Sequence, residues 1–239
     1  MPSNIRTNYS GHEAAYQLRK ARGDAGWGSP DCIAEEIAGF DALLREEYVP
    51  KRGRFLEVGC GAGEIALWFG EQGFEVYGVD LAPTAIAWAR EKTAASNIPA
   101  VFQVGDVLNL QDFADDFFDF VLDGHCFHCI IPAVQPGETR TDRERFLSSV
   151  WRVLKPGGYF RVNTMCGDPP DALKPRFDVN TRCMLREGPM GPFAERYHGM
   201  PQDILNEIRS AGFVIRRWHV AAAEHSDESD DLLVDAIKP

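Results

Sequence analysis

Short apolar runs alternate with longer helical stretches along most of this chain. Five of the runs have the length and the β-branched or aromatic content of buried strands, and they lie at 53–58, 74–79, 100–104, 118–123 and 158–164. Segments with helical periodicity fall between several of these runs, at 63–71, 83–96 and 141–154. Strands that alternate with helices in this way predict a parallel sheet with helices on both faces.

The last part of the chain predicts two strands of a different kind. A helix is expected over 201–211, and apolar runs follow at 213–220 and 232–237. The connection between these two runs is short and acidic, which favours an antiparallel hairpin over a helical crossover. We therefore predict an α/β fold with a doubly wound, mostly parallel sheet of seven strands and an antiparallel terminal hairpin strand.

Two segments depart from this pattern. Residues 1–50 contain helical stretches at 12–22 and 31–47, and we interpret them as an N-terminal helical flap before the main domain, 51–239. Residues 166–200 are rich in Pro and Gly, and we interpret them as a lid-like insertion because long connections inside a compact domain are often functional. A disordered surface loop is the alternative for this stretch.

Composition and charge narrow the class of partner. The 239 residues are enough for one large globular domain, and the net charge of −11 disfavours a nucleic-acid or membrane-surface partner, since either needs a basic face. No apolar run is long enough to span a membrane, and the first residues lack the apolar core of a signal peptide. We therefore expect a cytoplasmic protein with reduced cysteines, and the sequence predicts no particular oligomeric state.

A glycine-rich turn follows the first predicted strand. Its glycines are Gly59, Gly61 and Gly63, and Asp80 ends the next apolar run. Glycine lets the backbone bend sharply and approach a ligand closely, and a carboxylate at Asp80 suits the two hydroxyls of a ribose. The same spacing also fits a dinucleotide-binding fingerprint.

The charge around this turn favours one nucleotide over the other. Residues 55–89 contain no Lys, Arg or His, yet Glu57 lies inside the first strand. A buried carboxylate there needs a cation or a hydrogen-bond donor. S-adenosylmethionine (SAM) offers an ammonium group, a sulfonium and a ribose, whereas a pyrophosphate gains nothing from acids. An NAD(P)-dependent oxidoreductase stays open as an alternative, because such sites hold phosphate mainly with backbone N–H groups.

Four motifs together resemble the class I SAM-dependent methyltransferases, over roughly residues 50–239. They are Glu57-x-Gly59-x-Gly61-x-Gly63, Asp80 after the second strand, Gly105-Asp106-Val107, and Val153-Leu154-Lys155-Pro156-Gly157-Gly158-Tyr159. The terminal hairpin also resembles the reversed seventh strand of that family. The resemblance implies a Rossmann-like methyltransferase fold with SAM as the cofactor.

The resemblance also implies a role for each motif residue. The three glycines would lie against the methionine part of SAM, Glu57 would reach its amino group, and Asp80 would hold the ribose. Leu81 would pack on the adenine, and Asp106 and Val107 would make further contacts with it.

Asp123 ends the fourth strand, where the resemblance places the sulfonium. Ordinary turn or capping residues are the alternative for Asp106 and Asp123. Tyr16 and Trp27 of the flap are expected to close over the cofactor and exclude water, with simple helix packing as the alternative.

A segment rich in His and Cys follows the fourth strand. We predict that His125 or His128 acts as a general base toward the methyl acceptor, because ligands bind beyond the carboxyl ends of parallel strands. A metal site formed by Cys126, Cys129 and one histidine is an alternative, but a second ligand pair is not evident and we predict no metal. The third possibility is a pocket wall in which no residue is a base, since alignment alone can promote methyl transfer.

The predicted reaction is transfer of the methyl group of SAM to a small-molecule acceptor by in-line displacement. A non-catalytic cofactor-binding scaffold is a second alternative to it. A minor one is a thiol-dependent metalloid methyltransferase with Cys126, Cys129, Cys166 and Cys183 at the acceptor mouth. Side chains of the insertion that suit an acidic or aromatic acceptor are Arg176, Arg182, Arg186, Arg196, Tyr197 and His198.

Overall fold

A computed structural model describes residues 6–188, 191–223 and 228–239. Parts of the predicted flap (1–5), insertion (189–190) and hairpin connection (224–227) lie outside the described residues. The main sheet has seven strands in the order β3-β2-β1-β4-β5-β10-β9. In chain order these are β1 (Gly53–Val58), β2 (Phe74–Asp80), β3 (Ala100–Val104), β4 (Phe118–Asp123), β5 (Leu154–Met165), β9 (Val214–Ala221) and β10 (Asp231–Ile237).

The strand directions confirm the predicted sheet. The first five strands pair in parallel, and β10 runs antiparallel to both of its neighbours, β5 and β9. β5 begins at Leu154, four residues before the predicted start, because Leu154 already pairs with Phe118 of β4.

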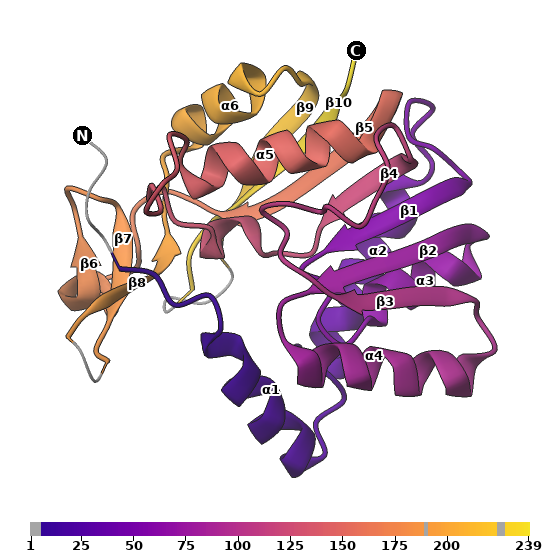
Figure 1. The fold of residues 1–239 in the computed structure, drawn as a ribbon, viewed down its shortest axis with the longest axis horizontal. Coiled ribbons are helices and arrows are strands. Elements are labelled where there is room, and N and C mark those ends of the chain that lie inside the picture. Colours follow the sequence, from indigo (N-terminus) through magenta and orange to yellow (C-terminus); the bar gives the residue numbers. More distant parts are fainter. Residues whose placement is uncertain (1–5, 189–190, 224–227) are drawn as a thin grey trace.

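Helices cover both faces of the main sheet (Figure 1). One face carries α2 (Pro30–Leu43), α3 (Glu64–Glu71) and α4 (Pro83–Ser96), and the other carries α5 (Asp142–Val153) and α6 (Pro201–Ser210). Neighbouring residues of β1 show why its apolar run is continuous: Phe55 packs in the layer that contains Phe69 of α3, and Leu56 packs in the layer that contains Phe146 of α5. No helix among the described residues has the length and apolar content needed to cross a bilayer.

The N-terminal segment forms two helices, as predicted. α1 (Gly11–Arg22) lies beside α4, where Lys20 pairs with Glu91 at 2.7 Å and Glu13 accepts hydrogen bonds from the backbone N–H and hydroxyl of Thr84. α2 ends at Leu43, before the predicted residue 47.

The insertion at 166–200 contains strands that its sequence did not predict. A 3-10 turn, η2 (Lys174–Arg176), precedes β6 (Phe177–Asp178), β7 (Cys183–Arg186) and β8 (Phe193–Tyr197), which form a separate small sheet. The small sheet lies beyond one end of the main sheet (Figure 1). Its edge is extended by the start of the chain, since the Ala194 N–H donates to the Arg6 carbonyl at 2.8 Å and Thr7 forms a parallel bridge with Ala194.

Candidate functional site

A cavity of about 880 Å³ lies at the carboxyl ends of the parallel strands. Its walls come from the segments that follow β1, β2, β3 and β4, from α1 and α2, and from β7 and β8 of the small sheet. This is the edge of an open α/β sheet where ligands bind, and the volume suits a small molecule or a cofactor.

The glycine turn forms one wall of the cavity. Gly59 has a φ of 73° and Gly61 a φ of 52°, which are left-handed conformations that favour glycine. A Cβ on Gly61 would lie 2.5 Å from the Tyr16 hydroxyl, so Tyr16 of α1 rests directly on the turn. Gly63 faces the core, unlike Gly61. It directly precedes α3, and a Cβ there would meet Phe102 of the core at 2.8 Å.

Asp80 connects two parts of this wall. One carboxylate oxygen accepts a hydrogen bond from the Gly61 N–H (2.9 Å) and the other accepts one from the Ala82 N–H (2.8 Å). Burial raises the pKa of Asp80 against the opposing effect of these two hydrogen bonds. Each oxygen can accept a second hydrogen bond, so the carboxylate keeps capacity for a ligand hydroxyl.

Glu57 has a buried, unsatisfied carboxylate oxygen at the cavity wall. Its side chain is only 4% exposed, and within the described chain its Oε2 has no hydrogen-bond partner. Burial first, and then the charges of Glu36 and Glu64, raise the pKa of Glu57 well above its ordinary value. A buried carboxylate with one oxygen unpartnered at a ligand cavity favours a ligand that brings a positive charge or a donor.

The residues predicted to contact adenine lie on the wall after β2 and β3. Leu81, Asp106 and Val107 all line the cavity, and Asp106 accepts a hydrogen bond from the Leu108 N–H at 2.9 Å. Asp123 is different. It is 1% exposed and does not line the cavity.

The Asp123 carboxylate serves the backbone that follows β4. Its Oδ1 accepts hydrogen bonds from the N–H groups of Cys126 (2.9 Å) and Phe127 (3.0 Å), and burial raises its pKa to about 6. The structure therefore places Asp123 as a capping residue behind the cavity wall, although its Oδ2 is buried with no partner among the described residues, and its role at the sulfonium end stays a prediction.

Both predicted flap residues reach the cavity. The rings of Tyr16 and Trp27 lie 5.0 Å apart, and His12 contacts Trp27 with a ring separation of 5.5 Å. His12 and Glu36 also line the cavity, although the sequence analysis did not select them. His12 precedes Tyr16 by four residues on α1, so helical spacing was the signal that could have found it.

The two predicted base candidates lie together, with rings 4.5 Å apart, and both line the cavity. His125 Nε2 lies 3.0 Å from a carboxylate oxygen of Asp231 at the start of β10. Burial alone would lower the pKa of His125, but the hydrogen bond and charge of Asp231 outweigh it and raise that pKa. Burial lowers the pKa of His128 well below its usual value, and its Nδ1 is buried with no partner among the described residues.

The four cysteines of the minor alternative do not gather at one place. Cys126 and Cys129 line the cavity, whereas Cys166 and Cys183 are buried outside its lining. Burial raises the pKa of Cys129 to about 12, which keeps this thiol protonated. Over the part of the chain that the structure describes, no group of three or more His, Cys, Asp or Glu side chains is arranged to hold a metal ion.

The insertion contributes two of its predicted side chains to the cavity, Arg186 and Arg196. Arg182 instead holds the insertion together, since it donates to the carbonyls of His198 (2.6 Å) and Gly167 (2.7 Å). Arg176 is exposed, and neither it nor Tyr197 or His198 lines the cavity.

A buried arginine that the sequence analysis missed supports the segment carrying both histidines. Arg143 of α5 is 1% exposed and donates to the carbonyls of Phe127 (2.8 Å) and Ile130 (3.0 Å). The same guanidinium pairs with Glu207 of α6 at 2.7 Å. η1 (Phe127–Cys129), the short turn that contains His128, is thereby tied to two helices.

Comparison with known proteins identifies relatives of this chain. A family model described as a methyltransferase domain matches residues 56–162. The chain is 30% identical to an S-adenosyl-L-methionine-dependent Diels-Alderase, iccD, of Talaromyces variabilis, over 84% of this chain and 62% of that protein. It is 29% identical to a tocopherol O-methyltransferase of Arabidopsis thaliana, over 69% of this chain and 41% of that protein. The chain thus spans less than two thirds of the length of either relative.

Solved structures share the fold. A SAM-dependent methyltransferase of Methanosarcina mazei superimposes with a TM-score of 0.66 at 22% identity, covering 82% of this chain and 96% of that one. The [4+2]-cyclase SpnF superimposes with a TM-score of 0.68 at 16% identity, covering 98% and 97%.

Proposed function

Because the chain belongs to the class I SAM-dependent methyltransferases, enzymes whose cofactor is SAM, we propose that it transfers the methyl group of SAM to a small-molecule acceptor. The observation that carries this proposal is the presence, in one cavity, of the glycine turn and two acids: Glu57, whose Oε2 has no partner among the described residues, and Asp80, which is bound to the turn. The Diels-Alderase relative favours a second candidate, a cyclisation in which the cofactor is bound but not consumed.

The residues present fit the cofactor. Glu57 would hold its ammonium group and Asp80 its ribose, while Leu81, Asp106 and Val107 would contact the adenine. When bound, SAM supplies an electrophilic methyl group, and transfer proceeds by in-line displacement once the acceptor atom is aligned with it. Tyr16 and Trp27 would exclude water from the aligned pair.

We assign the proton-accepting role to His128. It lines the cavity and its Nδ1 has no partner in the described part of the chain, so the neutral ring can accept a proton from the acceptor, although its lowered pKa makes it a weak base. His125 has a raised pKa and a carboxylate partner in Asp231, so it suits the role of a hydrogen-bond donor beside His128.

Calorimetry tests the proposed function directly. We expect the protein to bind S-adenosylhomocysteine (SAH), the product form of the cofactor, and not to bind NAD. Incubation of the protein with SAM and a panel of small-molecule acceptors should then yield SAH together with a methylated product. NAD binding without SAH binding would contradict the proposal, and acceptor conversion without SAH formation would favour the cyclisation candidate.

The affinity for SAH should rise with pH. In the free protein the pKa of Glu57 is raised well above its ordinary value, and the ligand's ammonium group would lower it again in the complex. Binding would then release a proton, so affinity increases as the pH rises through the window between the two pKa values.

Calorimetry at about pH 5–7, in buffers with different ionisation enthalpies, measures the released proton. Glu57→Gln should abolish the release. Glu71→Gln is the matched control, because Glu71 is an exposed acid at the end of α3, outside the cavity lining, and proton release should persist. Equal release in wild type and Glu57→Gln would contradict the assignment.

A further inference from the structure

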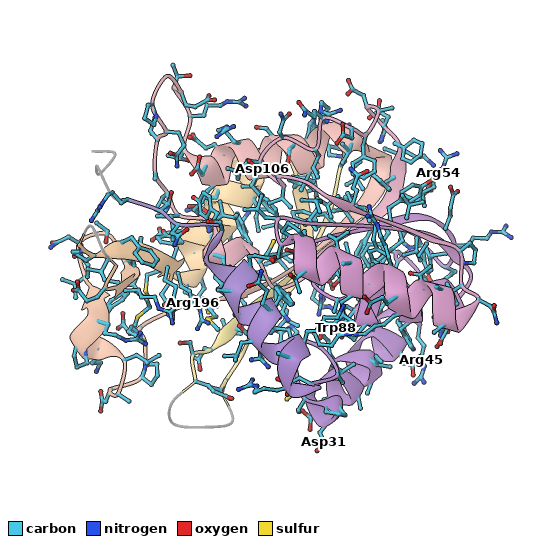
Figure 2. The ribbon with its side chains drawn as sticks, turned by 60° about the horizontal axis from the view of Figure 1, so that its bottom comes forward. Asp31, Arg45, Arg54, Trp88, Asp106 and Arg196 are labelled. Atoms are coloured by element: carbon cyan, nitrogen blue, oxygen red, sulfur yellow. The ribbon has the colours of Figure 1, made fainter. Side chains whose placement is uncertain are left out.

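Arg196 brings an unpaired cation into the cavity from the small sheet. It lies on β8, it lines the cavity, and Figure 2 labels it. Its Nε is buried without a hydrogen-bond partner, and across the described ranges its guanidinium forms no salt bridge. The adjacent acid cannot neutralise it, because Glu195 pairs with Arg186 at 2.9 Å.

The side chains close to this guanidinium are neutral. Burial, with the positive charge of Arg196 in addition, lowers the pKa of both His12 and His128. Burial also raises the pKa of Cys129 to about 12, although the charge of Arg196 opposes this. The two imidazoles and the thiol that line the cavity together with Arg196 are therefore uncharged.

The charges of the cavity are thus divided between its walls. The acids that suit the cofactor, Glu57 and Asp80, lie on or beside the glycine turn, whereas Arg196 comes from the insertion, beside the candidate base His128. A guanidinium with a buried, unsatisfied N–H is costly, and an oxyanion is the group that satisfies it best, through two parallel hydrogen bonds.

We propose that Arg196 binds an oxyanion of the methyl acceptor, so that acceptors are small molecules carrying a carboxylate or an acidic hydroxyl. This proposal rests on the proposed function and names the substrate class of the same site. The unpartnered Nδ1 of His128 offers a second polar contact on that side of the cavity. The methionine carboxylate of the cofactor has the same chemistry, and the experiment below separates the two sources.

Matched ligand pairs test the substrate class. Benzoate, salicylate and 2-naphthoate are each titrated into SAH-saturated protein. The three corresponding amides are titrated in the same way, so that each carboxylate is compared with its own amide. The wild type should bind at least one carboxylate about tenfold more tightly than its amide. Arg196→Gln should lose that preference, keep its affinity for SAH and keep its melting temperature, and Arg196→Lys should restore part of the preference.

Arg176→Gln is the matched control, because it removes the same charge from the same insertion at an exposed position outside the cavity lining. It should retain the carboxylate preference. The proposal is overturned if no pair shows a preference, including the case in which neither member binds, or if the preference survives in Arg196→Gln. Loss of SAH affinity in Arg196→Gln would assign the guanidinium to the cofactor carboxylate instead.

Failure of the wild type to bind SAH is a separate result. It contradicts the proposed function alone, and the ligand pairs are then titrated into the free protein.

Discussion

Gly59→Ala should destabilise the protein by about 2–5 kcal/mol, whereas Gly157→Ala should cost only about 1–2 kcal/mol. Both glycines have nearly the same left-handed backbone, with φ values of 73° and 77°. A Cβ on Gly59 would lie 2.5 Å from the Cβ of Cys126, while one on Gly157 would meet nothing within 4 Å. The two substitutions therefore share the backbone strain and differ in the steric clash.

Urea denaturation of the two variants measures this difference. Gly59→Ala should also weaken SAH binding, because the glycine turn cannot move without breaking the hydrogen bonds from Gly59 and Cys60 to the Val79 carbonyl, at 2.8 and 3.1 Å. Equal stability of Gly59→Ala and Gly157→Ala would show that the segment after β4 moves away from the added methyl group without cost. The close contact between Gly59 and Cys126 would then not constrain the site.

Arg143→Met should destabilise the protein by about 3–5 kcal/mol, the cost typical of removing one partner of a buried ion pair. Methionine is apolar and of adequate length, but it has no N–H groups. The carbonyls of Phe127 and Ile130 and the carboxylate of Glu207 would each lose a partner. Turnover should fall more than SAH affinity, since the freed segment carries His128 rather than the glycine turn.

Arg209→Met on α6 is the matched control. The Arg209 side chain is exposed and donates to the side-chain oxygen of Asn206 on the same helix at 3.2 Å. Its loss should cost less than about 1 kcal/mol. Urea denaturation of both variants measures the difference: similar losses would mean that Arg143 is no more important than an exposed arginine.

The main sheet was predictable because its local sequence and its packing agree. Phe55 and Leu56 are adjacent in β1 and face opposite helical layers, so a strand in this position must be apolar throughout. The glycine turn and Asp80 were equally visible, since left-handed backbone requires glycine and an acid after an apolar run is uncommon.

Residues whose partners are distant in the chain were not predictable in the same way. Asp231 lies 106 positions from His125, and Glu207 lies 64 positions from Arg143. Nothing in either local sequence indicates the partner, because the pairing arises only when β10 and α6 dock beside the end of β4. Glu36 was missed for the same reason, since its approach to Glu57 depends on how α2 packs.

At two places the local sequence did not indicate what the structure shows. Asp123 has the right residue type and the right strand end for a ligand contact, yet the N–H groups that follow it bind one of its carboxylate oxygens, Oδ1, behind the cavity wall. The small sheet escaped prediction because its strands are only 2, 4 and 5 residues long and lie in a stretch rich in Pro and Gly, so each strand gives a weak local signal.

The bridge between Thr7 and Ala194 joins the two segments that cover the cavity, the N-terminal segment and the small sheet. α1, which carries Tyr16, begins four residues after Thr7, and β8, which carries Arg196, contains Ala194. An outward swing of α1 must either break this pairing or draw β8 along with it. The Thr7–Ala194 pairing therefore couples the movements of the N-terminal segment and the small sheet.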